Sequence, residues 1–598
     1  MANELSVLII GLGTRGLGVL ERLLAIAAAH PAPVRVQVVD PTCDGTGLHT
    51  PAQPDYLLLN TVCGQVTMFP DRAMIGAGPE RRGPSLYEWA TGRDLRVGAD
   101  GWTVGEVGRP IRPTDFLPRR VLGEYLRWFL GELVRSAPAN VRVTFHRAQV
   151  VELVDHLGPG LAFRLSDDTV ASVDSVFLTT GHTPNTRPAA PGRVIDALYP
   201  LPATLDRVEP GQSVAIGGMG LSAMDALAAL TVGRGGTFAG DRRYRPSGRE
   251  PSVLMFCTSG VPFRARPLVN RPLPGYVPVA LTEPTIDRLR HERGPLDFDT
   301  DLLPLVLAEM RAAYHRRRAT MAGEPDPFAN VRTPGEVEVL LNALDTAHGG
   351  FDAYAAWTGS EGMALTSGQS YQDWAVDFIR ADLAEGVLGF EGSPVKAGID
   401  ILRDLRDTIR YAVDFGGLTA DSLRSFLAVA VPRMNRAVVG PQHDRHRDLL
   451  ALVEAGVVSL AAGPAPEVTW LPTDRWRISS TRLAVPFERD VDWLCRAHVP
   501  YPAVGSSASP LLVSLREAGL LRSVPGATGV AVDRDQHPIR TDGATERRIR
   551  VLGPLCEGST FYNHLVPSPG AFSRPPADAQ RCVAALFGAD VVAAGRAS

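Results

Sequence analysis

The chain is poor in cysteine, and the cysteines that it has form no recognisable motif. Six occur among 598 residues: Cys43, Cys63, Cys257, Cys495, Cys556 and Cys582. No two form a Cys-x-x-Cys pair, and none joins a histidine in a cluster with zinc spacing. His443 and His446 are three residues apart, but no third ligand follows at a useful distance. We therefore expect reduced thiols and no metal site.

A large charge of one sign and a long apolar run are also absent. The chain has 61 Lys+Arg and 65 Asp+Glu, a net charge of −4, which argues against a general nucleic-acid binder. No stretch reaches the ~20 uncharged residues that a membrane span needs. The apolar run at 5–10 is short and has no basic flank, so it does not resemble a signal peptide. We expect a cytoplasmic protein that binds neither nucleic acid nor membrane. Nothing in the sequence fixes the oligomeric state.

Two common catalytic motifs are missing as well. There is no Gly-x-Ser-x-Gly elbow, which argues against a serine hydrolase of that type. The glycine-rich stretch at 217–223 lacks the Lys-Ser/Thr pair of a Walker loop, which disfavours a kinase or an ATPase.

The first 40 residues have the order of a dinucleotide-binding unit: strand, glycine turn, helix, strand. An apolar strand at 7–10 leads into GLGTRG, and a helix and a second strand follow. Gly11 permits the tight turn, Gly13 lets a pyrophosphate approach the backbone, and Gly16 lets the helix pack closely. The phosphates would then meet the helix N-terminus at Thr14. Asp40, after the second strand, can accept hydrogen bonds from an adenosine ribose.

Residues 211–257 repeat this order. Gly218 and Gly220 keep the spacing, Ser222 follows in the turn, and Ala223 takes the close-packing position. No acid ends the next strand, and Arg264 and Arg266 come shortly after it. This pattern favours a nucleotide with a 2′-phosphate, as in NADPH. A solvated loop is the alternative for the two arginines.

Two such turns predict two nucleotides, and a protein that holds two dinucleotides usually passes hydride between a nicotinamide and a flavin. The apolar strand that ends at Thr180-Gly181-His182 would return the chain to a bound FAD. Residues 284–460 show apolar stripes at helical spacing. We therefore predict an α/β fold with two Rossmann-like domains and a large helical insertion. The expected divisions are a discontinuous FAD domain at 1–205 and 501–598, a nicotinamide domain at 206–283 and 461–500, and the insertion at 284–460.

Several further stretches carry a resemblance to a known family. They include NTVCGQVTMFPD (60–71), SLYEW (85–89), PRR before GEY (118–125), YRPSGREP (244–251) and GPLCEGS (553–559). With the two glycine turns, they resemble the FAD/NAD(P)-binding flavoproteins related to class B flavin monooxygenases and amine N-hydroxylases. Within that family the chain looks most like the actinobacterial aspartate N-monooxygenases that form nitrosuccinate in natural-product pathways. One departure is Thr258, where relatives are expected to carry an arginine that favours NADPH over NADH.

The resemblance and the positions in the chain together suggest roles for individual residues. Asn60 and His182 are the candidate catalytic residues beside the flavin; a turn or cap role is the alternative for each. Arg119 precedes a helix and could hold pyrophosphate, unless it forms a surface salt bridge. Gly181, and the backbone of the turn at Gly553, Gly558 and Ser559, would face the flavin. Arg264 is a candidate for the nicotinamide nucleotide, and Arg266 and Arg445 are candidates for the carboxylates of a substrate.

These observations predict an FAD- and NADPH-dependent monooxygenase that uses O₂ to hydroxylate the amine of a small amino acid. The resemblance makes L-aspartate the best single candidate. Two alternatives stay open: a flavin dehydrogenase, oxidase or reductase without oxygen transfer, and a non-catalytic FAD-binding protein. The sequence separates them poorly, because oxygen transfer by a flavin requires no diagnostic side chain.

Overall fold

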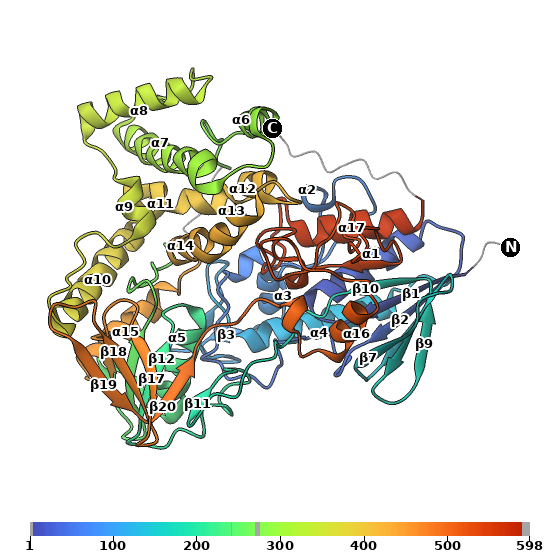
Figure 1. Cartoon of the computed structure of the whole chain (residues 1–598), viewed down its shortest axis with the longest axis horizontal. Coiled ribbons are helices and arrows are strands. Elements are labelled where there is room, and N and C mark those ends of the chain that lie inside the picture. Colours follow the sequence, from blue (N-terminus) through green and yellow to red (C-terminus); the bar gives the residue numbers. More distant parts are fainter. Residues whose placement is uncertain (1–3, 241, 269–274, 589–598) are drawn as a thin grey trace. The chain divides into compact units, whose positions relative to one another are not determined.

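The computed structural model describes residues 4–240, 242–268 and 275–588, and the chain divides into two compact units. Unit 1 comprises residues 1–187, 413–416 and 500–598, and unit 2 comprises 188–412 and 417–499. Each unit contains a five-stranded parallel sheet, so the predicted α/β class is confirmed (Figure 1). The helical segment and the second glycine turn fall in the same unit, and the short stretch 413–416 belongs to unit 1.

The central sheet of unit 1 has the strand order β21-β10-β1-β2-β6, and every neighbouring pair is parallel. Its strands are β1 (Leu5–Ile10), β2 (Val34–Val39), β6 (Val141–His146), β10 (Ser175–Leu178) and β21 (Ile549–Val551). The apolar residues at 7–10 are almost fully buried, as expected for a strand covered on both faces. Because the strands are parallel, their carboxyl ends meet at one edge, where open α/β sheets bind ligands.

Helices and two small sheets complete unit 1. The helices are α1 (Thr14–Ala27), α2 (Arg72–Ile75), α3 (Leu86–Gly92), α4 (Arg119–Arg135), α16 (Pro510–Glu517) and α17 (Arg574–Leu586). One small antiparallel sheet joins β7 (Val150–Asp155), β8 (Leu161–Leu165) and β9 (Val170–Val173); the other joins β3 (Arg96–Val97), β4 (Val104–Gly105) and β5 (Arg109–Pro110). Tyr125 and Phe129 anchor α4 in the core beside α1.

Unit 2 repeats the parallel arrangement with the order β11-β20-β12-β15-β16. Its strands are β11 (Val194–Ile195), β12 (Ser213–Gly217), β15 (Ser252–Phe256), β16 (Val458–Ser459) and β20 (Trp493–Arg496). The second glycine turn lies between β12 and α5 (Leu221–Leu230). A short pair, β13 (Thr237–Phe238) and β14 (Tyr244–Arg245), follows α5. An antiparallel sheet is formed by β17 (Glu467–Leu471), β18 (Arg475–Ser480) and β19 (Phe487–Val491).

The segment expected to be mainly helical is helical. Its helices are α6 (Glu283–Arg293), α7 (Leu303–Ala322), α8 (Pro334–His348), α9 (Ala353–Thr358), α10 (Gly368–Gly392), α11 (Pro394–Asp404), α12 (Arg406–Val413), α13 (Ala420–Ser425), α14 (Val431–Val438) and α15 (His443–Glu454). Side-chain caps fix several starts; Thr333 and Glu336, for example, form a capping box at α8. Helices α7 and α11 pack against each other. Within the residues that the structure describes, no helix combines the length and apolar character that crossing a membrane requires.

Two glycines of α1 test how tightly this helix packs. A Cβ atom at Gly16 would lie 2.0 Å from the Gly11 carbonyl oxygen, whereas one at Gly18 would meet nothing within 4 Å. Overpacking of this kind costs about 1–3 kcal/mol, so Gly16→Ala should lower the thermal unfolding midpoint of the apoprotein. Gly18→Ala, the matched control, should keep or raise the midpoint because alanine favours helix. Equal midpoints for the two variants would contradict the close packing.

Candidate functional site

The first glycine turn lies at the carboxyl edge of the unit 1 sheet, pressed against the end of β10. Gly11 has a φ of +93°, and a Cβ there would lie 2.7 Å from the Thr179 carbonyl oxygen. A Cβ at Gly16 would collide with the Gly11 carbonyl oxygen, so the turn has no room for side chains at either position. Gly11 and Gly16 are therefore required by packing within the protein.

Gly13 plays a different part, because its surroundings are open. Its φ of −74° suits any residue, and a Cβ there would meet only the Cα of Gly47, 3.7 Å away. Gly47 itself has a φ of +54°. Gly13 is the N-cap of α1 and provides no side-chain cap, so the slot between Gly13 and Gly47 lies at the start of a helix whose first N–H groups, from Thr14 on, receive no acceptor from the cap. The arrangement fits an anion such as the pyrophosphate of FAD.

Asp40 is held by the backbone around the turn. Its Oδ2 accepts a hydrogen bond of 2.9 Å from the Leu12 N–H, and its Oδ1 accepts from the N–H groups of Thr42 and Cys43, at 2.9 and 3.0 Å. Asp40 thus ties the loop after β2 to the glycine turn. Its proposed contact with a ribose stays a prediction.

Several buried polar atoms of unit 1 have no hydrogen-bond partner among the described residues, and three of them belong to residues that the sequence places near the flavin. These three are the Asn60 Oδ1, the Thr180 Oγ1 and the His182 Nδ1. Thr180 and His182 directly follow β10, beside Gly181 with its φ of +69°. Buried polar atoms are normally hydrogen-bonded, so these atoms suit a polar ligand. The residues present therefore fit a flavin nucleotide.

A second histidine, His564, lies against His182. Their rings are stacked with centroids 5.2 Å apart and an interplanar angle of 11°, and the Tyr501 ring lies 5.2 Å from His564. Burial lowers the pKa of each histidine to about 4, helped by His564 for His182 and by Arg15 for His564. Both imidazoles are therefore neutral near pH 7. The sequence analysis missed His564, because no local motif marks it.

Arg119 begins α4 and holds the chain just before Asn60. Its Nε donates to the Leu58 carbonyl oxygen at 3.1 Å, and its backbone N–H donates to that of Leu57 at 2.8 Å. Burial and the charge of Arg119 together lower the pKa of His49 to about 4. The structure thus assigns Arg119 a role in positioning the loop, and its contact with pyrophosphate stays a prediction.

The turn after β21 is built around two glycines with left-handed backbone. Gly553 and Gly558 have φ of +92° and +105°, and a Cβ at Gly553 would lie 3.3 Å from Arg15 Cγ. The Ser559 hydroxyl accepts from the Val532 N–H and donates to the Val530 carbonyl, both at 3.0 Å. The hydroxyl of Ser559 is thus engaged within the protein.

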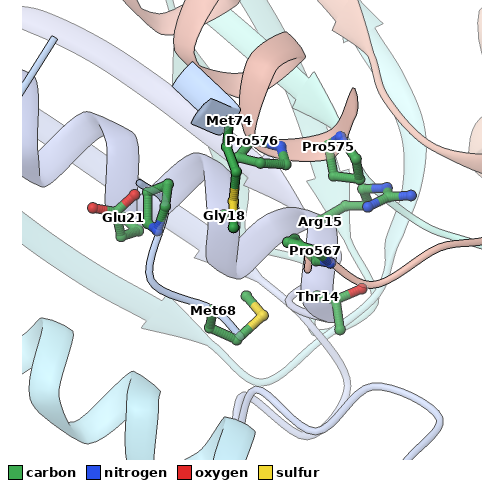
Figure 2. A pocket seen from close by; sticks show the side chains of 10 residues that line it. Thr14, Arg15, Gly18, Glu21, Met68, Met74, Pro567, Pro575 and Pro576 are labelled. Carbon is green, nitrogen blue, oxygen red and sulfur yellow. The ribbon is translucent and has the colours of Figure 1, made fainter. Parts of the chain in front are cut away.

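A small pocket runs along α1 (Figure 2). Thr14, Gly18 and Glu21 line it from successive turns of the helix, facing Met68 and Pro576. It contains about 340 Å³ of empty space, part of which is open solvent, and most of its lining is apolar.

The second glycine turn repeats the construction of the first. Gly218 has a φ of +145°, and a Cβ there would lie 2.8 Å from the carbonyl oxygen of Ala497, which follows β20 as Thr179 follows β10. Gly220, like Gly13, is a helix N-cap with ordinary backbone angles. A Cβ at Gly220 would lie 3.0 Å from the Phe263 ring. Ser222 lies in the first turn of α5.

Four cations line a tight crevice in unit 2. They are Arg264, Arg266, Lys396 and Arg403, and Asp400 is the one carboxylate in the lining. Lys396, Asp400 and Arg403 come from α11, and the sequence did not single them out. Because they lie more than 100 residues beyond Arg264 and Arg266 in the chain, only the fold brings them together.

A buried carboxylate holds two of these cations. Asp382 accepts from the Lys396 Nζ at 2.6 Å and from Arg264 at 3.1 Å. Burial alone would raise the pKa of Asp382, but Lys396 and Arg264 hold it below its ordinary value. Arg403 donates to Asp400 at 2.8 Å. The crevice therefore carries more cationic than anionic groups, and Asp382 and Asp400 pair with three of its four cations.

Arg445 lies on α15, and the crevice lining comes from other residues. Its guanidinium lies 3.4 Å from Asp448, whose pKa burial raises to about 6. The predicted contact of Arg445 with a substrate stays a prediction. In the part of the chain that the structure describes, no three His, Cys, Asp or Glu side chains gather as a metal site.

The fold and its two glycine turns define a protein with two dinucleotide sites, one on each parallel sheet. A family model described as FAD-NAD(P)-binding matches residues 8–183. Nitrosuccinic acid synthase of Aspergillus oryzae is 31% identical over 98% of this chain and 93% of its own. Two enzymes named L-aspartate N-monooxygenase (nitrosuccinate-forming) are each 34% identical. That of Streptomyces davaonensis matches over 86% of this chain and 85% of its own, and that of Streptomyces cremeus over 87% and 84%.

The chain belongs to this family of FAD- and NAD(P)H-dependent flavoprotein monooxygenases. The family resemblance, the enzyme class and the two cofactors inferred from the sequence are thereby confirmed. The assignment of individual site residues stays a prediction.

The two N-cap glycines provide a paired test of the cofactor sites. Gly13→Val fills the slot facing Gly47 and should abolish FAD binding, although its backbone angles tolerate the change. Gly220→Val should keep FAD bound but slow anaerobic flavin reduction by NADPH tenfold or more, a barrier increase of at least ~1.4 kcal/mol. FAD titration and stopped-flow absorbance measure the two effects, and each variant controls for the other. The opposite pattern would mean that the two sites are assigned the wrong way round.

Proposed function

We propose that this protein hydroxylates the amine of L-aspartate with FAD, NADPH and O₂ and carries it toward nitrosuccinate. The observation that carries this proposal is the match over 86–98% of the chain to three relatives named for nitrosuccinate formation. The cationic crevice in unit 2 supports it independently, because aspartate has two carboxylates.

When bound, FAD reduced by the nicotinamide nucleotide supplies the oxygen-transfer chemistry with O₂. The residues that would hold it are the turn at Gly11, Gly13 and Gly16 and the loop after β10. The amine of the substrate must be neutral to react. Since burial keeps His182 and His564 uncharged, this edge of the sheet offers a partly desolvated surface without a histidine cation.

The substrate carboxylates would be held by guanidinium groups of the crevice. Lys396 is buried and bound to Asp382, so its ammonium is fixed in place. The Arg403 side chain keeps 22% of its surface exposed and can present its planar guanidinium to a carboxylate. Arg266 also lines the crevice and is the further candidate for a substrate carboxylate. A preference for NADPH over NADH, by contact of Arg264 with a 2′-phosphate, is part of the same proposal.

We also propose a cytoplasmic location. All six cysteines are free of disulfides, which suits a reducing compartment.

The decisive assay measures product. Purified holoprotein with NADPH should consume O₂ faster when L-aspartate is added, and mass spectrometry should detect an N-oxygenated product. Flavin reduction without any oxygenated product, across a panel of amino acids and diamines, would replace this proposal with a dehydrogenase, oxidase or reductase. If NADPH does not reduce the bound flavin and no oxygenated product forms with any substrate, a non-catalytic FAD-binding protein would be favoured.

A variant of Arg403 tests the carboxylate site. A hydrogen bond to a charged group contributes about 1.5–3 kcal/mol, so Arg403→Met should raise the KM for aspartate roughly ten- to hundredfold. The KM for NADPH should stay unchanged; a rise for NADPH but not NADH would indicate a 2′-phosphate contact instead. Arg424→Met is the matched control, because Arg424 also pairs with an aspartate three residues earlier but is 65% exposed. An unchanged KM for aspartate in Arg403→Met would contradict binding of the substrate carboxylates in the crevice.

A further inference from the structure

Residues 413–416 lie within the expected helical segment at 284–460 but belong to unit 1. The chain on both sides of them belongs to unit 2. Asp414 is buried, with 8% of its surface exposed. Phe415 and Gly416 have φ of +54° and +81°. A left-handed backbone at a phenylalanine is uncommon and persists only where its surroundings enforce it.

This stretch makes polar contacts on both sides of the turn that follows β21. Asp414 Oδ1 accepts a hydrogen bond of 2.8 Å from the Phe561 N–H, and Asp414 Oδ2 pairs with Arg574, the first residue of α17. The Phe415 N–H donates to the Ser559 carbonyl oxygen at 2.7 Å. The Arg534 guanidinium lies 5.3 Å from the centre of the Phe415 ring. Asp414 and Phe415 therefore clamp residues 559–561.

The clamped turn continues into residues that contact both other loops at the sheet edge. Glu557 accepts from the N–H groups of Tyr562 and Asn563, at 2.9 and 3.1 Å, which fixes the path of the chain. Arg15, inside the first glycine turn, donates to the Asn563 carbonyl oxygen at 2.6 Å. His564 then stacks on His182, which follows β10. A displacement of Phe561 would thus be passed to the glycine turn and to the loop after β10.

We propose that Asp414 is a positioning residue for FAD, which acts by fixing the turn 559–564 against Arg15 and His182. Removing one partner of a buried ion pair leaves an uncompensated charge or an unsatisfied donor. The Phe561 N–H is the donor that connects Asp414 to the turn. The inference rests on FAD binding alone and does not depend on the identity of the substrate.

Three variants separate positioning from general stability. Asp414→Ala removes the contacts with Phe561 and Arg574, whereas Asp414→Asn keeps an oxygen that can accept from the Phe561 N–H. Glu546→Gln is the matched control: Glu546 is buried, pairs with Arg548 at 2.7 Å, and precedes β21 at the opposite end of that strand. The measurements are the FAD dissociation constant, the visible absorption spectrum of the bound flavin, and the thermal unfolding midpoint.

Asp414→Ala should raise the dissociation constant of FAD at least tenfold, which corresponds to ~1.4 kcal/mol, and shift the flavin spectrum. Asp414→Asn should show smaller changes in both. Glu546→Gln should lower the unfolding midpoint without changing either flavin property. The proposal is overturned if Asp414→Ala binds FAD with the wild-type constant and spectrum, or if Glu546→Gln alters both as strongly. If Asp414→Ala does not fold, Asp414→Asn decides: a raised constant with a shifted spectrum supports the proposal, and wild-type values refute it.

Discussion

At both glycine turns, a glycine packs directly against the backbone carbonyl group that follows the neighbouring strand. A side chain at Gly11 would meet the Thr179 oxygen, and one at Gly218 would meet the Ala497 oxygen. Because each turn is pressed onto the sheet there, the next helix starts at the carboxyl edge with its N–H groups facing outward. In unit 1 the first glycine turn contacts the loop after β10 through Thr179 and the segment after β21 through Arg15, which donates to the Asn563 carbonyl oxygen.

The same constraint produces two different surfaces in front of the helices. In unit 1, Gly13 faces Gly47, so two glycines leave a narrow space between backbone segments. In unit 2, Gly220 faces the Phe263 ring, and an aromatic ring can stack on a planar ligand. The loop that carries Phe263 continues into Arg264 and Arg266 of the crevice. The second turn therefore contacts a loop that carries the cations Arg264 and Arg266. The first turn contacts, through Arg15, the segment that carries the neutral His564.

Local pattern was sufficient to predict the two turns, the α/β class and the helical segment, because each of these elements is set by residues close together in the chain. Gly47, His564, Lys396 and Arg403 could not be predicted in this way, since tertiary packing alone brings them to Gly13, His182 and Arg264. Ser559 illustrates another limit. It lies in the predicted turn after β21, but its hydroxyl forms hydrogen bonds with the backbone of Val530 and Val532. The residue type alone does not indicate whether a serine hydroxyl binds a ligand or the protein backbone.

Buried charge is used in both units to fix loops. The strands β1 and β10 are almost entirely apolar inside, so burial of apolar surface accounts for the sheet. Asp414 with Arg574, and Asp382 with Arg264, instead join segments that are far apart in the chain. An apolar pair would avoid the desolvation cost of such ions, but it would not select one partner or orient a backbone N–H. Asp382 also accepts from the Ala265 N–H, as Asp414 does from that of Phe561. Each carboxylate thus sets the position of a loop backbone as well as that of a cation.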